Sequence, residues 1–168
     1  MNAMSALDPL TEPLVRLFLR IDAARPTDPL LGELSDFWQL KRGSKIVPGE
    51  ADLTGFSREV SPYVFLARLT ANETGHWIVS GAGFVASTVL QLKGGPELAI
   101  GDKRIAVRLR RLFDIVAEKI EPYSAMFEIG GQNGQRQLVE VFAAPLGNGE
   151  KGIHMIFAAI NSRTEAKQ

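Results

Sequence analysis

The spacing of apolar and charged positions predicts a helix at residues 9–24. Charged residues recur there at every fourth position, and nearly all of the remaining positions between 10 and 21 are apolar. The charged stripe consists of Asp8, Glu12, Arg16 and Arg20. A helix with so little polar surface needs cover on two sides. We therefore expect this segment to pack on the chain's own sheet, in a dimer interface, or in both, with a membrane-surface helix as the remaining alternative.

A second helix is predicted at Pro29–Arg42. Leu34, Phe37 and Trp38 follow the spacing of one helical face, and the basic last turn suits the helix dipole. Gly43 can adopt the left-handed conformation that ends a helix.

After residue 62 the apolar period becomes two, which predicts five antiparallel strands. They span residues 63–70, 76–81, 123–129, 135–144 and 152–160. Asn133-Gly134 and Asn148-Gly149 are strong signals of two-residue hairpin turns, because both turn positions require positive φ. The last three strands are therefore expected to form a meander.

Two helices are predicted between the second and third strands, a short one near residues 84–92 and a long one at about residues 102–120. The long helix has a regular apolar stripe formed by Ile105, Leu109, Leu112 and Val116. Its arginines Arg104, Arg108 and Arg111 could clamp an anion, although a solvated helix face is the explanation we favour.

The segment from Phe37 to Pro48 carries a family resemblance. A Phe-Trp pair, three residues, Arg-Gly and a short loop to proline resemble the entry to a bacterial family of single-domain PAS-like proteins. The resemblance spans roughly residues 34–160, and the strand at residues 76–81 looks like the family's second strand. Ile78 stands where that family often has a basic residue, so no role of that side chain carries over.

The resemblance implies an α+β fold with a PAS-like five-stranded antiparallel sheet, helices over one face and a cavity between them. To this fold the chain adds its N-terminal helix. We expect an N-terminal helical extension at residues 1–28, a PAS-like domain at residues 29–162 and a polar tail at residues 163–168. The family uses this fold to sense small molecules or to contact proteins.

Composition narrows the function classes. Lys and Arg together number 19, as do Asp and Glu, so the chain lacks the positive field that nucleic-acid binding requires. It has no cysteine, and charges interrupt its apolar N-terminal run. We expect a cytoplasmic protein that binds neither nucleic acid nor a membrane.

No pattern of catalytic residues is present. The chain has no Ser-His-Asp order, no paired carboxylates and no P-loop, and its two histidines, His76 and His154, lack the spacing of a metal site. Residues 81–86 match the dinucleotide pattern Gly-x-Gly-x-x-Ala but lack its parallel βαβ context. We expect no enzymatic activity, no metal and no cofactor, with noncovalent flavin or haem as the open alternative.

The leading hypothesis is therefore a regulatory PAS-like module that binds a small ligand of unknown identity, a signalling partner protein, or both. The alternatives are a small-molecule enzyme or carrier on a similar helix-covered sheet, and a purely structural dimerisation module. We expect a homodimer that depends on the N-terminal helix. The candidate interface residues are Leu14, Leu17, Phe18 and Ile21.

The hairpin turns also predict one unusual residue, Glu140. Two-residue turns would place Glu140 opposite both Phe127 and Phe157, on an aromatic face under the long helix. The candidate ligand pocket consists of Tyr123, Phe127, Glu140, Phe142, Met155 and Phe157, with Arg104 and Arg108 above them. A carboxylate there should pair with an arginine, bind a ligand or stay protonated, unless a bulge or the opposite face assignment places it in solvent.

Overall fold

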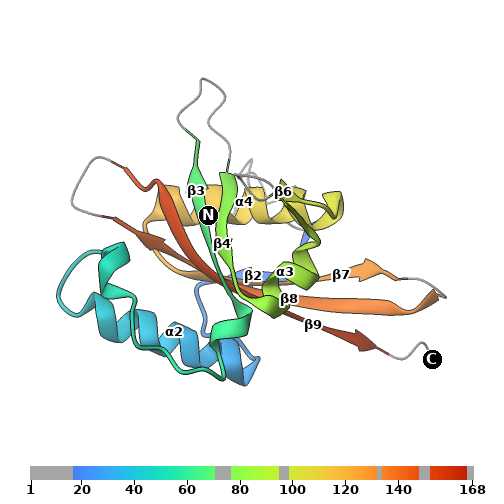
Figure 1. Cartoon of the computed structure of the whole chain (residues 1–168), viewed down its shortest axis with the longest axis horizontal. Helices are drawn as coiled ribbons and strands as arrows, with labels where there is room; N and C mark the ends of the chain where they lie inside the picture. Colours follow the sequence, from blue (N-terminus) through green and yellow to red (C-terminus); the bar gives the residue numbers. More distant parts are fainter. Residues whose placement is uncertain (1–16, 71–76, 95–98, 132–133, 148–151, 166–168) are drawn as a thin grey trace, which may run out of the picture.

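The chain forms an α+β fold around one six-stranded antiparallel sheet (Figure 1). The computed structural model describes residues 17–70, 77–94, 99–131, 134–147 and 152–165. The strand order is β2-β7-β8-β9-β3-β4. The bounds are β2 Arg20–Asp22, β3 Val64–Leu69, β4 Trp77–Ala82, β7 Tyr123–Gly130, β8 Arg136–Leu146 and β9 Met155–Glu165.

Three helices and several short elements complete the described residues. The helices are α2 Pro29–Arg42, α3 Phe84–Leu90 and α4 Lys103–Lys119. The short elements are the 3-10 turns η1 Glu50–Asp52 and η2 Ser61–Tyr63 and a separate two-stranded sheet of β5 Leu92–Lys93 and β6 Ala99–Ile100. The element order predicted after residue 29 is confirmed.

Helix α2 begins and ends where its capping residues predict. The Asp28 carboxylate accepts hydrogen bonds from the backbone N–H groups of Leu30 and Leu31, which supplies partners for the free donors of the first turn. Gly43 ends the helix with a φ of 55°, a conformation that costs glycine little.

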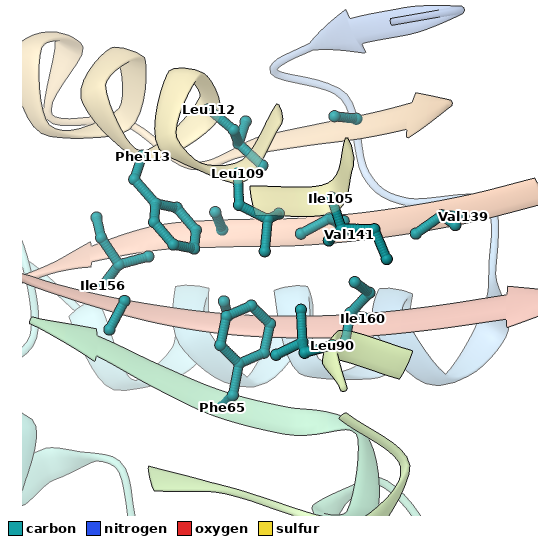
Figure 2. Close-up of a cluster of buried hydrophobic side chains, with 14 of the residues drawn as sticks. Phe65, Leu90, Ile105, Leu109, Leu112, Phe113, Val139, Val141, Ile156 and Ile160 are labelled. Atoms are coloured by element: carbon teal, nitrogen blue, oxygen red, sulfur yellow. The ribbon is translucent and has the colours of Figure 1, made fainter. Parts of the chain in front are cut away.

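Helices α3 and α4 cover one face of the sheet. The apolar stripe of α4 points down onto the strands, where it meets side chains from β3, β8 and β9 (Figure 2). The cluster includes Phe65, Leu90, Ile105, Leu109, Leu112, Phe113, Val139, Val141, Ile156 and Ile160, all at most 1% exposed. The four residues predicted as the buried stripe of the long helix are confirmed.

Helix α2 covers the opposite face, so the prediction that this helix shares one face with α3 and α4 is wrong. Its residues Leu31, Leu34 and Trp38 are fully buried and pack against a second cluster of strand residues. That cluster contains Val64, Phe142, Ala144, Leu146, Phe157 and Ala159. The indole Nε1 of Trp38 donates a hydrogen bond to the carbonyl oxygen of Pro145 at 3.0 Å, which fixes the helix on the sheet. Figure 1 shows α2 and α4 on opposite sides of the strands.

The predicted register between β7 and β8 is wrong by one residue. Glu140 lies opposite Met126, and Phe127 lies opposite Val139. The backbone hydrogen bond from Gly131 N to Gln135 O closes this hairpin across three residues, and Gly134 has a φ of 72°. A three-residue loop with glycine in the left-handed region is the next most common hairpin connection after the two-residue turn.

The predicted register between β8 and β9 is wrong by four residues. Glu140 lies opposite Asn161, and Leu146 with Met155 is the last pair. The backbone N–H of Gly147 donates to the carbonyl oxygen of Pro48, so β8 leaves the hairpin ladder before residues 148–149. A shift by an even number keeps Glu140 on the same face as Phe157.

The N-terminal helix cannot extend to residue 24, because Arg20–Asp22 is strand β2 and pairs with β7. The backbone N–H of Leu19 donates to the carbonyl oxygen of Met126 at 2.8 Å, so this segment completes the exposed edge of β7. Residues 9–16 of the predicted helix lie outside the described residues. Residues of the same sheet lie on both sides of each predicted domain boundary. Strand β2 precedes the boundary at residue 28, and strand β9 continues past the boundary at residue 162 to Glu165.

The Gly-x-Gly-x-x-Ala segment serves a close backbone contact. A Cβ on Gly83 would overlap the carbonyl oxygens of Ser61 and Pro62, whereas a Cβ on Gly81 would meet nothing within 4 Å. All strand pairs of the six-stranded sheet are antiparallel. The parallel βαβ unit of a dinucleotide site is therefore absent from the described residues.

Because helices cover both faces of the sheet, a cavity made under either helix should destabilise the protein to a similar degree. Leu34→Ala under α2 and Leu109→Ala under α4 should each lower the free energy of unfolding by about 2–5 kcal/mol, because each truncates a buried side chain. Val107→Ala, on the exposed side of α4, should change it by less than about 0.5 kcal/mol. Urea unfolding measures all three, and a Leu34→Ala protein as stable as the Val107→Ala protein would contradict the second buried face.

Candidate functional site

Glu140 occupies one row of side chains that crosses four strands. Arg20 of β2 lies opposite Met126 of β7, which lies opposite Glu140 of β8, which lies opposite Asn161 of β9. Residues that face each other in register share a face of the sheet, so this row points toward the α2 side. The register alone therefore brings an arginine, a carboxylate and an amide together.

Glu140 is 6% exposed, and its carboxylate accepts hydrogen bonds from the segment that leads into α2. Its oxygens accept from the backbone N–H of Thr27 at 2.8 Å, from Thr27 Oγ1 at 2.9 Å and from the backbone N–H of Asp28 at 3.1 Å. Arg20 Nη2 lies 3.2 Å from Oε2 and completes the set. Glu140 is thus buried and paired with an arginine, which was one of the outcomes considered, but it lies on the face opposite to the predicted one and its arginine is Arg20 rather than Arg104 or Arg108.

These contacts compensate the cost of burying a carboxylate. Leaving such a charge unpaired in a protein interior costs several kcal/mol, and hydrogen bonds to charged groups recover about 1.5–3 kcal/mol each. The carboxylate also lies just before the first turn of α2, where the helix dipole favours negative charge. Because Arg20 is 30% exposed, its Coulomb contribution is screened, and the backbone donors contribute most of the compensation.

Asp28 and Ser124 extend the same network. The second oxygen of Asp28 accepts from Asn161 Nδ2 at 2.7 Å, while its first oxygen caps α2. Ser124 Oγ is fully buried and donates to the carbonyl oxygen of Ala24 at 2.9 Å. Four separate backbone segments are thus joined through the cluster of Arg20, Thr27, Asp28, Ser124, Glu140 and Asn161, called the Glu140 cluster below.

A small cleft opens beside the Glu140 cluster. Its volume is about 40 Å³, and its lining residues are Asp28, Leu138, Glu140, Asn161, Ser162 and Arg163. The cleft admits a few water molecules and is well below the volume of about 300–1,000 Å³ that is typical of ligand pockets.

The arginines of α4 lie on the other side of the sheet. Arg104 pairs with Asp102 at 2.9 Å, and its hydrogen bonds hold the pKa of the Asp102 carboxyl below the ordinary value. Arg108 Nε donates to the carbonyl oxygen of Leu17 at 2.8 Å, and the guanidinium lies 5.2 Å from the centre of the Phe127 ring. Burial, with the nearby charge of Arg104, lowers the pKa of Arg108.

Because of the register, the residues of the predicted pocket do not share one face. Glu140, Phe142, Met155 and Phe157 lie on the α2 side. Tyr123 and Phe127 lie on the α4 side, together with the arginines. The prediction of one pocket lined by all of them is wrong in its geometry, because the one-residue shift turns every β7 side chain over.

The predicted dimer residues that the structure describes contact the chain's own core. Phe18 is 7% exposed and packs edge-on against Phe127, with ring centres 6.0 Å apart. Leu17 and Ile21 are partly buried against the same cluster. Leu14 lies outside the described residues.

An apolar groove lies along the flank of α2, and the sequence patterns did not indicate it. Its volume is about 300 Å³ and it lies between α2 and the loop at residues 55–60. The lining residues are Glu33, Leu34, Asp36, Phe37, Leu40, Gly55, Phe56, Ser57 and Val60. The residue that could have indicated the groove is Leu40, a large apolar residue on the solvent side of α2, where it is 76% exposed. Such a side chain is unusual where it adjoins other apolar surface.

Among the described residues, no three His, Cys, Asp or Glu side chains are grouped as metal ligands. The helices within the described ranges are too short or too polar to cross a membrane. Comparison with family models, with curated proteins and with solved structures gave no match to this chain.

The Glu140 cluster predicts a charge-specific contribution to stability. Glu140→Gln should lower the free energy of unfolding by about 2–3 kcal/mol, because the amide nitrogen cannot accept and one of the Thr27 and Asp28 N–H groups loses its partner. Glu128→Gln is the matched control, since Glu128 meets Arg136 at 3.5 Å on the partly exposed side of β7 and should cost at most about 1 kcal/mol. Urea unfolding at neutral pH compares them, and equal effects would contradict the role assigned to Glu140.

Proposed function

We propose that this chain is a non-catalytic regulatory module of PAS-like layout that acts through protein contacts. The order of its elements supports the layout. Apart from β2 and the short pair β5–β6, a helix, two strands, two helices and three strands follow one another as the resemblance implies. The resemblance implies two uses of that layout, and we favour contact with proteins over the sensing of a small molecule.

The packing under α4 supports this choice. A sensing domain of this layout would hold its ligand between the long helix and the sheet. Here Phe65, Leu109, Phe113 and Val141 meet in that space, each at most 1% exposed (Figure 2). A ligand could enter only by displacing core side chains, which costs several kcal/mol for each cavity or overpacked position.

The groove on α2 is the observation that carries the proposal. It is open to solvent, and Phe37 and Phe56 form its wall with ring centres 5.4 Å apart. Aromatic and aliphatic side chains around a hollow, with a polar rim, resemble the energetic centre of protein interfaces. Glu33, Asp36 and Ser57 supply such a rim.

The Glu140 cluster gives the module a route for communication. It joins residues 20–28 to β8 and to the first turn of α2, and α2 carries the groove. A contact that shifts α2 therefore acts on the segment where the N-terminal residues join the sheet. This route agrees with regulation through the N-terminal segment.

Site-specific photocrosslinking in the native cells tests the proposal. A benzoylphenylalanine placed at position 40, in the groove, should give a discrete covalent product with a protein. The same group at position 107 on α4, where Val107 is 50% exposed, should give none. Absence of any product at position 40 above the level at position 107 would contradict the proposed function.

A further inference from the structure

We propose that the flank of α4 that carries Arg108 and Arg111 binds a small oxyanion, a phosphate or carboxylate group of a ligand from outside the chain. The flank lies on the side of the sheet opposite to α2 and its groove, and the inference does not depend on the proposed function. It is also distinct from the space between α4 and the sheet, which core side chains fill.

Positive charge is concentrated on α4. The whole chain has equal numbers of basic and acidic residues, whereas α4 carries six basic side chains and two acidic ones. Arg104, Arg108 and Arg111 follow one another at intervals of four and three residues, so they lie along one flank of the helix. A local excess of one charge attracts ligands of the opposite charge.

The first two arginines of this flank have acceptors within the protein. Arg104 meets the Asp102 carboxylate at 2.9 Å and the carbonyl oxygen of Gly130 at 2.6 Å. Arg108 donates to the carbonyl oxygens of Leu17 and Arg104, both at 2.8 Å. Within the described part of the chain no carboxylate forms an ion pair with Arg108, so its charge is not neutralised.

Arg111 is the arginine of this flank that lacks an acceptor. Its side chain is half-buried, and its Nε is closed off from solvent and has no hydrogen-bond partner among the described residues. A buried donor without an acceptor is rare in native proteins, because it has given up its hydrogen bonds to water. The solvated helix face that the sequence favours therefore does not account for Arg111.

The position of Arg111 explains why the protein supplies no acceptor. Helix α4 and strand β7 run in opposite directions, and Arg108 lies over the Phe127 ring. Arg111 is about 4.5 Å further along the helix, which brings it level with Ala125 of β7. Ala125 pairs with Ile21 of β2, and both side chains belong to the apolar cluster under α4. Neither side chain can accept a hydrogen bond.

An oxyanion is the ligand that these two side chains fit. A guanidinium presents its N–H groups in a planar fork that matches two oxygens of a phosphate or carboxylate group. Arg108 and Arg111 are three residues apart, so rotation of the Arg111 side chain brings both forks to one ligand. The apolar side chains below them strengthen such charge-assisted hydrogen bonds. Because Arg108 also holds the Leu17 carbonyl, the ligand would stabilise the segment that leads into β2.

Titration of the full chain with inorganic phosphate tests the inference. In ¹⁵N NMR spectra the Nε–Hε resonances of Arg108 and Arg111 should shift to saturation with phosphate, and chloride of equal ionic strength should leave them in place. Arg111→Gln should weaken phosphate binding, followed at Arg108, about tenfold or more, because one of two guanidinium groups is lost. Arg110→Gln is the matched control and should bind as the wild type does, since Arg110 is exposed and points about 100° away around the helix axis.

Thermal unfolding separates a ligand-binding role of Arg111 from a structural one. In chloride buffer Arg111→Leu should melt at the wild-type temperature or above it, because the substitution removes a buried donor that has no acceptor. Phosphate should raise the melting temperature of the wild-type protein but not that of Arg111→Leu. A variant that melts lower in chloride would assign Arg111 to the fold and contradict the inference.

The same titration with acetate identifies the ligand class, because the anion that binds more tightly names the group that the flank prefers. Three further outcomes would overturn the inference. They are the absence of saturable binding of either anion above the chloride level, binding that survives Arg111→Gln, and an Arg111 resonance that Asp8→Asn or Glu12→Gln moves before any anion is added. The last result would show that the chain's own N-terminal residues supply the carboxylate.

Discussion

Burial of strand β8 on both faces constrains the rest of the structure. All residues of β8 from Leu138 to Leu146 are buried, and Glu140 is the ionisable one among them. A carboxylate at that position has to be satisfied within the protein. The chain meets this requirement by folding residues 20–28 across the sheet, so that β2 supplies Arg20 and the entry to α2 supplies two backbone donors. Glu140 thus holds the entry to α2, while Leu31, Leu34 and Trp38 pack the helix itself on the sheet.

Features set by local chemistry were predictable from the sequence. The capping residues and prolines set the bounds of α2 and α4, and the apolar stripe of α4 from Ile105 to Val116 identified its buried face. Asn-Gly pairs located both hairpins but not their lengths, because a three-residue loop with Gly134 uses similar residues. One residue of error was enough to move Phe127 and Tyr123 to the other face.

The burial of both faces of the sheet also has a sequence signal. Nearly continuous apolar runs mark strands that are buried on two sides, and residues 138–146 form such a run, interrupted only by Glu140. Strand β2 had no such signal. Its residues Arg20–Asp22 fit the charge stripe of a helix equally well, and only pairing with the edge of β7 decides their conformation. The groove on α2 likewise depends on how the loop at residues 55–60 folds back.

Glu140 holds the entry to α2 on the sheet, and residue-resolved amide hydrogen exchange of the wild-type protein by NMR tests this role most directly. We expect the N–H groups of Thr27 and Asp28 to exchange as slowly as strand amides, although both precede the helix, because they donate to a buried carboxylate. Exchange of these two amides at the rate of a solvated loop would contradict it.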